Sequence, residues 1–164
     1  MRVRSFAKMD FEIRQGDKKD LGQVMDLIRE LAVFEKAGDQ VLIDENTLLK
    51  DGFSNTPRFD FLVACKEDTV LGMALFYYKY STWQGTSLYL EDLIVAQSAR
   101  NQGIGTALLK SLVTKAKKED LARLEWQVLD WNTDAIRFYE RMGAEFDEEW
   151  TTCRLYKNNY NLHA

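Results

Sequence analysis

Residues 87–113 read SLYLEDLIVAQSARNQGIGTALLKSLV, and this stretch decides the fold. It opens with a nearly continuous apolar run over residues 88–95, which is typical of a strand buried on both faces. Two close glycines, Gly103 and Gly105, come next, and apolar residues then recur at helical spacing up to Lys118. A strand, a glycine-rich turn and a helix in this order predict an α/β domain.

The glycine-rich turn, RNQGIGT over residues 100–106, is the most specific local motif. Glycines let the backbone approach an anion closely, and the N–H groups at a helix start attract it. A phosphate-bearing ligand fits such a turn, and a purely structural strand-to-helix turn is the alternative. The Lys-Ser/Thr ending of a Walker A loop is absent, and Leu108 takes the third glycine position of a dinucleotide fingerprint.

Two carboxylates, Glu91 and Asp92, interrupt the apolar run. Because side chains alternate along a strand, we expect them to point to opposite sides of the sheet. Burying an unpaired carboxylate costs several kcal/mol, so each needs a partner or a cleft that admits solvent. A structural ion pair is one interpretation of each residue. A cleft beside the phosphate-binding turn is the functional one.

The rest of the chain predicts further elements. They are a strand near residues 11–13, a helix capped by Asp17 and ended by Gly38, a helix at 44–50, an antiparallel hairpin of strands at 59–66 and 70–80, a strand at 87–95, a helix at 103–118, a strand at 122–129, a helix at 132–142 and a strand at 150–157. The order is β-α-α-β-β-β-α-β-α-β. We find no linker and expect one domain over residues 11–164, with residues 1–10 as a flexible leader.

Composition excludes several classes of protein. The 22 Lys and Arg against 26 Asp and Glu give a net charge of −4, without the basic excess of a nucleic-acid-binding protein. Small cationic molecules are the more fitting partners. The single histidine, His163, leaves no imidazole for a Ser-His-Asp triad or a histidine-rich zinc site, and we expect no metal.

The cysteines and the apolar runs indicate the cellular compartment of the protein. Cys65 and Cys153 lie far apart and form no C-x-x-C motif, which is typical of reduced cytoplasmic proteins. No apolar run approaches the roughly 18 residues that a membrane span requires. We therefore expect a cytoplasmic protein with no membrane partner.

Several motifs together resemble the GCN5-related N-acetyltransferase (GNAT) superfamily. They are Arg100-x-x-Gly103-x-Gly105 after a strand, Asp130-Trp131-Asn132, and Phe138-Tyr139-x-x-x-Gly143. A narrower set resembles the diamine (spermidine/spermine) acetyltransferases, above all their thialysine N-epsilon-acetyltransferase branch: IRELA at 28–32, FEK at 34–36, DGF at 51–53, STW at 81–83, YLED at 89–92 and VLDWN at 128–132. The resemblance extends over about residues 11–156. It implies the GNAT fold, an α/β domain with a mixed, mostly antiparallel sheet flanked by helices.

The resemblance also implies acetyl-CoA as co-substrate, a small amine as substrate, a homodimer and the following site residues. The catalytic ones are Glu91 and Tyr139. The cofactor-binding ones are Leu93, Ile94, Val95, Arg100, Asn101, Gln102, Gly103, Ile104, Gly105, Thr106, Asn132, Thr133, Asp134 and Ala135. The substrate-binding ones are Phe34, Glu35, Trp83, Glu91, Asp92, Glu125, Trp126 and Gln127.

These roles agree with the chemistry of acetyl transfer. The amine must lose its proton before it attacks a thioester, and an ordinary ammonium with a pKa near 10.4 keeps that proton at neutral pH. By resemblance, Glu91 attracts the ammonium and relays its proton, and Tyr139 protonates the departing thiolate. Structural alternatives remain for two residues: Tyr139 has the spacing of a core aromatic residue, and Asn132 is a good helix cap.

Departures from the polyamine-specific pattern narrow the range of expected substrates. Those relatives carry an aspartate where this chain has Ser81 and a tyrosine where it has Phe34. Glu35 remains for a second positive group, so we expect thialysine or a similar short diamine. The alternatives are a polyamine N1-acetyltransferase and a catalytically inactive acetyl-CoA-binding module. The homodimer has a second basis in the predicted last strand and its extension at residues 158–162.

Overall fold

The computed structural model describes residues 10–147 and 149–160, with only the backbone of Asn158. The chain forms two compact units, Met1–Gln127 and Val128–Ala164, and each is described by itself. The first unit holds a sheet with its helices. Among its described residues, the second holds one α-helix, a short 3-10 helix and no strand. No helix among the described residues is both long and apolar enough to cross a bilayer.

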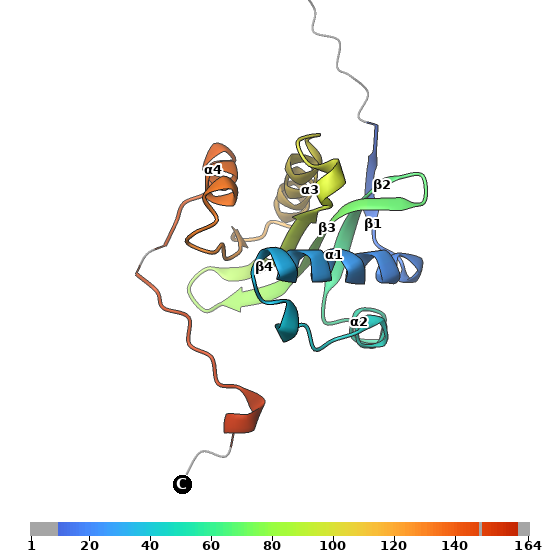
Figure 1. Cartoon of the computed structure of the whole chain (residues 1–164). Coiled ribbons are helices and arrows are strands. Elements are labelled where there is room, and N and C mark those ends of the chain that lie inside the picture. The colour runs from blue at the N-terminus through green and yellow to red at the C-terminus, as the bar shows by residue number, and fades with distance from the viewer. Residues whose placement is uncertain (1–9, 148, 161–164) are drawn as a thin grey trace, which may run out of the picture. The chain divides into compact units, whose positions relative to one another are not determined.

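The first unit is built on a five-stranded sheet in the order β1-β2-β3-β4-β5 (Figure 1). Its strands are β1 (Glu12–Gln15), β2 (Asp60–Lys66), β3 (Thr69–Ser81), β4 (Gly85–Val95) and β5 (Leu124–Glu125). The first three pairings are antiparallel and the β4–β5 pairing is parallel. A mixed, mostly antiparallel sheet is thus confirmed, together with the predicted hairpin of β2 and β3.

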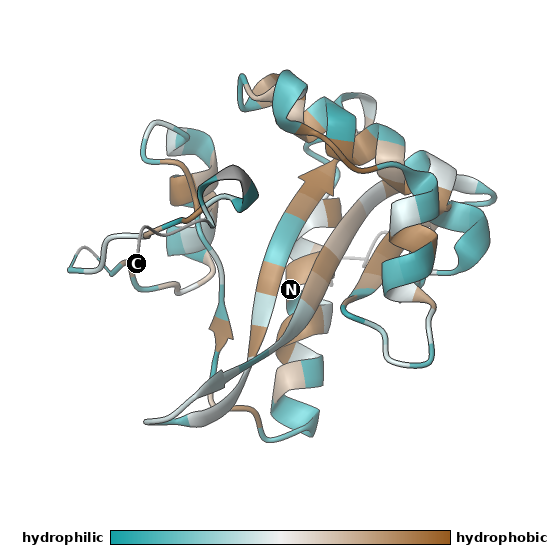
Figure 2. Cartoon of the chain, turned by 90° about the horizontal axis from the view of Figure 1, so that it is seen from below, coloured by the Kyte–Doolittle hydropathy of each residue, from teal (hydrophilic) through white to brown (hydrophobic). Residues whose placement is uncertain are grey.

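Helices α1 (Leu21–Phe34) and α2 (Glu45–Gly52) cover one face of the sheet (Figure 1). Asp17 caps the 3-10 helix Lys18–Asp20, which leads directly into α1, through a capping box with Asp20, so the predicted cap acts one turn before α1. Apolar residues of both helices pack on β2, β3 and β4 in one core, which includes Val24, Met25 and Leu48. Most of the apolar colour in Figure 2 lies in the central strands and on the inner sides of the helices.

The end of α1 differs from the prediction. The helix stops at Phe34 and not at Gly38, because Lys36 adopts the left-handed conformation with φ of 59°. Its neighbour Ala37 donates its N–H to Ala32 O at 2.8 Å, so the helix end is closed by a turn of the Schellman type. Glu35 therefore caps α1, which places it at the end of the helix.

Helix α3 (Ile104–Lys118) lies on the opposite face of the sheet (Figure 1). It approaches β3 closely at Gly72, where an added Cβ would lie 2.8 Å from the carbonyl oxygen of Ile94 and 3.2 Å from Ile104. Only glycine fits there. The helix thus begins directly beside the end of β4, and the turn of residues 96–103 between them is held in place.

Two expectations about the C-terminal part are corrected. The strand predicted at 122–129 is only the two-residue β5, since Leu124 and Glu125 alone pair with β4. The strand predicted at 150–157 is wrong: residues 149–156 form no strand, and a short 3-10 turn, Lys157–Asn159, follows. Trp150, Leu155 and Tyr156 are exposed. These residues have high β-propensity, but this segment has no neighbouring strand among the described residues with which its backbone could pair.

Candidate active site

The centre of the candidate site is a β-bulge in β4. Leu75 lies opposite Asp92 and the next residue, Phe76, lies opposite Leu90, so Glu91 is an extra residue in the ladder. Leu75 belongs to the core beneath α1, which places Asp92 on that face. Tyr77 shares this face, two residues further along β3, and its hydroxyl donates to Glu91 Oε2 at 3.1 Å. Both carboxylates therefore lie on the α1 face, and the prediction of opposite sides is wrong.

The Glu91 carboxylate lies at an exposed position beside two stacked tyrosines. The rings of Tyr77 and Tyr89 lie 5.2 Å apart, and Lys79 is placed over the Tyr89 ring at 5.4 Å. Burial and the charge of Glu91 raise the pKa of Tyr77, so its hydroxyl stays protonated and acts as a donor. Tyr77 is not among the predicted site residues, because its contact with Glu91 depends on the register of β3 against β4.

Asp92 is the less solvated of the two carboxylates. Burial raises its pKa to about 6, and the charges of Glu91 and Glu35 add to this effect. Burial also raises the pKa of Glu35. Among the described residues, no hydrogen bond or ion pair to Asp92 is formed. Asp92 thus lies near two further carboxylates, and no ion pair of its own within residues 10–147 and 149–160 offsets their repulsion, which favours binding of a cationic ligand.

The predicted cofactor turn has the geometry of an anion site. Asn101 and Gly103 are left-handed, with φ of 63° and 81°, and an added Cβ on Gly103 would meet nothing within 4 Å. The first intrahelical bond of α3 runs from Ala107 N to Gly103 O. The N–H groups of Ile104, Gly105 and Thr106 therefore point out of the helix with no acceptor in the described part of the chain. This cradle fits the phosphates of a CoA thioester.

The strand before the turn is open along one edge. β5 pairs with β4 only at Leu88 and Tyr89, so among the described strands no partner follows the β5 edge of residues 90–95. Of the predicted cofactor residues here, Ile94 points its side chain into the core beneath α1, while Leu93 and Val95 are half-buried. The backbone of this segment is available to pair with an extended ligand arm.

The remaining predicted substrate residues of this unit differ in their surroundings. Trp83 is exposed in the turn between β3 and β4. Glu125 already accepts from two cations, Lys79 at 2.5 Å and Arg123 at 2.7 Å. Trp126 is half-buried and Gln127 is exposed, directly after β5. Phe34, at the end of α1, lies under the guanidinium of Arg100 at 5.6 Å.

In the second unit, Asn132 begins α4 (Thr133–Arg141), and its Oδ1 accepts from Ala135 N at 3.3 Å. The predicted cap is confirmed. Thr133 and Asp134 occupy the first turn, with Asp134 placed favourably for the helix dipole. Tyr139 is buried, and its ring lies 5.1 Å from that of Phe138, which agrees with both interpretations of this residue. In the part of the chain that the structure describes, no cluster of His, Cys, Asp or Glu could hold a metal ion.

An acidic face and a helix start with outward-pointing N–H groups, joined by one bulged strand, make up the candidate site. The family model described as Acetyltransferase (GNAT) family matches residues 24–144, and the chain belongs to this family. It is an N-acetyltransferase.

Known relatives are similar over most of the chain. A thialysine N-epsilon-acetyltransferase of Bos taurus is 40% identical over 141 residues, which are 81% of this chain and 83% of the relative. A spermidine/spermine N(1)-acetyltransferase-like protein 1 of Homo sapiens is 33% identical over 88% of this chain but only 22% of its own length. A solved integron cassette protein from the mobile metagenome of V. cholerae superposes with a TM-score of 0.76 at 29% identity, covering 94% of this chain and 97% of the other.

Proposed function

We propose that this enzyme transfers the acetyl group of acetyl-CoA to the primary amine of a short diamine-like amino acid such as thialysine. The observation that carries the proposal is the bulge that turns Glu91 and Asp92 to one face of β4. The same strand leads into the glycine-rich turn. In this proposal the ammonium site lies on β4, and the phosphate site lies at the start of α3, which follows that strand in the chain.

The cofactor cradle assigned to acetyl-CoA consists of backbone groups. The N–H groups at the start of α3 would hold the pyrophosphate, and Gly103 keeps the space above them open. The open edge of β4 would hold the pantetheine arm by backbone hydrogen bonds. Bound acetyl-CoA supplies the activated acetyl group as a thioester. The same edge of β4 would orient that group toward the two carboxylates.

The carboxylates have separate tasks in this proposal. Asp92 and Glu35 attract the ammonium group, because three acids near one another lower the electrostatic potential there. Glu91, at the exposed position, also faces the ammonium and accepts its proton directly or through water, and Tyr77 orients its carboxylate. The neutral amine then attacks the carbonyl carbon directly. By family resemblance, Tyr139 gives its hydroxyl proton to the departing thiolate.

A short diamine is favoured over a polyamine by the acids that the site lacks. Ser81 stands where polyamine-specific relatives carry an aspartate, and its Oγ accepts from the N–H groups of Trp83 and Gln84 at 3.3 and 3.2 Å. Ser81 therefore shapes the turn and offers no charge. Glu125 is already engaged by Lys79 and Arg123. Few acids remain for the distal ammonium groups of spermidine.

The deciding experiment is an amine panel with acetyl-CoA. We expect the highest kcat/KM for thialysine or a related short diamine and a clearly lower value for spermidine. A higher value for spermidine would favour the polyamine N1-acetyltransferase. Binding of acetyl-CoA without turnover of any amine would favour the catalytically inactive module.

We also infer a cytoplasmic homodimer. Two thiols with no disulfide between them, Cys65 buried and Cys153 exposed, support a reducing compartment. The exposed apolar side chains of Trp150, Leu155 and Tyr156 support a partner surface, although they lie in no strand. Residues 161 and 162 of the predicted extension lie outside the described residues. A monomer in light scattering at micromolar concentration would contradict the dimer.

A further inference from the structure

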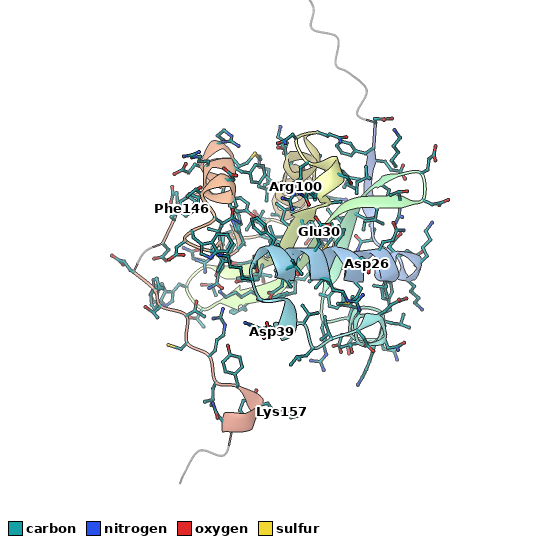
Figure 3. All side chains as sticks on the ribbon, in the orientation of Figure 1. Asp26, Glu30, Asp39, Arg100, Phe146 and Lys157 are labelled. Atoms are coloured by element: carbon teal, nitrogen blue, oxygen red, sulfur yellow. The ribbon has the colours of Figure 1, made fainter. Side chains whose placement is uncertain are left out.

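One carboxylate of α1 forms a hydrogen bond and an ion pair with residues 96–103, the turn between β4 and α3 that leads into the glycine-rich motif. The N–H of Gln97 donates to Glu30 Oε1 at 2.9 Å, and Arg100 Nη2 lies 3.6 Å from the same oxygen. Figure 3 shows Glu30 on α1 with Arg100 next to it. Glu30 thereby joins a helix on one face of the sheet to the turn assigned to the cofactor.

The guanidinium of Arg100 is engaged by the protein on several sides. Its Nε donates to the carbonyl oxygen of Val95 at 3.2 Å, and its plane lies over the Phe34 ring at 5.6 Å. Together with the nearby Glu30 carboxylate, these contacts hold the guanidinium against the end of β4 and against α1. The cradle itself needs no arginine, because the N–H groups of Ile104, Gly105 and Thr106 supply the donors.

The contacts of Glu30 and Arg100 also involve the end of α1, which carries residues proposed to bind the amine. Phe34 and Glu35 form the end of α1, and a shallow groove of about 470 Å³ separates this end from the turn. The groove is lined by Arg29, Glu30, Val33, Phe34, Gln97 and Arg100. A change in the contacts of Glu30 would therefore alter the turn and the end of α1 together.

We propose that Glu30 is a positioning residue that holds the cofactor turn through Gln97 and Arg100, and that Arg100 serves this link and not the phosphates. The proposal rests on the proposed function, since it assigns a role toward acetyl-CoA. The hydrogen bond from Gln97 is its stronger part, because a carboxylate acceptor strengthens a hydrogen bond. The ion pair with Arg100 is exposed and contributes less.

The first test is calorimetry with CoA on the wild type, Glu30→Gln, Glu30→Ala and the control Asp26→Ala. Asp26 lies on α1 one turn before Glu30 and forms its own exposed ion pair with Arg29 at 3.3 Å. In the described part of the chain it makes no hydrogen bond or ion pair with Gln97 or Arg100. We expect the Kd to rise about 5- to 20-fold in Glu30→Ala and about 2- to 5-fold in Glu30→Gln, which keeps an acceptor oxygen. Asp26→Ala stays within twofold.

A role of Arg100 at the phosphates predicts a change of the Kd for CoA in the opposite direction. If Arg100 binds the phosphates and Glu30 competes for it, both Glu30 variants bind CoA as tightly as the wild type or more tightly, and the proposal is overturned. A double-mutant cycle adds a second criterion. If both residues act through one link, the double variant Glu30→Ala with Arg100→Ala binds CoA with the same Kd as the single variant that binds it less tightly. Additive losses would overturn the shared role.

Amide exchange in the protein without ligand separates this proposal from the proposed function. We expect the Gln97 N–H to exchange at least about tenfold faster in Glu30→Ala than in the wild type, with no change in Asp26→Ala. Unchanged exchange of Gln97 in Glu30→Ala overturns the link. A wild type that binds no CoA overturns the proposed function and the role of Glu30 toward it, whatever the exchange rates.

Discussion

Glu91 and Asp92 are consecutive in β4, yet both carboxylates lie on the face of the sheet that α1 covers. The bulge opposite Leu75 and Phe76 is the cause, because one extra residue shifts the alternation of side chains. In a regular strand the two acids would point to opposite faces of the sheet. The bulge places both on one face, where they can contact the same ligand. This arrangement buries Asp92 and places it near the charge of Glu91, and both effects raise the pKa of Asp92.

Asp92 should lower the stability of the fold at neutral pH. Its pKa rises from 3.8 in the unfolded chain to about 6, so over this interval the folded state holds more protons and loses stability as pH rises. We expect Asp92→Asn to raise the free energy of unfolding by roughly 1–2 kcal/mol at pH 8 and to leave it unchanged at pH 3. Urea unfolding at both pH values measures this. An exposed control, Asp26→Asn, should show no such dependence.

Gly103→Val should abolish binding of CoA, because the branched side chain would fill the space above the N–H groups of α3. Gly85→Val is a matched control. Gly85 also has a positive φ, 92° against 81°, and an added Cβ also meets nothing within 4 Å. Both variants should lose about 1–3 kcal/mol of stability through backbone strain. Calorimetry on the folded proteins should find CoA binding only in Gly85→Val. Equal affinity in both would exclude the turn from the site.

Tyr139→Phe tests the proposed acid. The ring packing against Phe138 is kept and the hydroxyl is lost, so kcat should fall about 10- to 1000-fold while KM for the amine changes little. Steady-state kinetics should be paired with a check that chemistry limits turnover. A wild-type kcat under that condition would make Tyr139 a packing residue.

Glu91→Gln should act on a different kinetic constant. The amide keeps an acceptor for the Tyr77 hydroxyl but removes the charge that faces the ammonium. KM for the amine should therefore rise, and kcat/KM should fall most at neutral pH, where the substrate is protonated. A pH profile measures this. The same fall at every pH would argue against a role of Glu91 with the ammonium.

Asp20 should stabilise the fold, in contrast to Asp92. Its buried carboxylate binds Arg14 through two hydrogen bonds of 2.7 and 2.8 Å, which hold the pKa of Asp20 below its usual value. This contribution is present above the unfolded pKa and is lost as pH falls through the folded pKa. We expect Asp20→Asn to cost about 2–4 kcal/mol at pH 7, and the cost to shrink in acid. Urea unfolding of Asp20→Asn and Asp26→Asn should differ clearly; equal losses would contradict this.

Local signals in the sequence were sufficient for most elements. The predicted caps Asp17 and Asn132 each bond the backbone of the helical segment that they precede. The hairpin of β2 and β3 and the helix after Gly103 follow from apolar periodicity and glycine alone. These features depend on residues close together in the chain, and such contacts can be read from spacing.

Tertiary structure decided what depends on distant partners. The strand expected at 150–157 needs a neighbour to bond its backbone, and the short β5 ends where its pairing with β4 ends. The bulge at Glu91 arises only from the register of β4 against β3. The link from Glu30 to Gln97 and Arg100 spans residues far apart in the chain. The sequence by itself determined the family pattern and the anion-binding turn, whereas the common face of the two carboxylates followed from strand pairing, because register is a property of two strands and not of one.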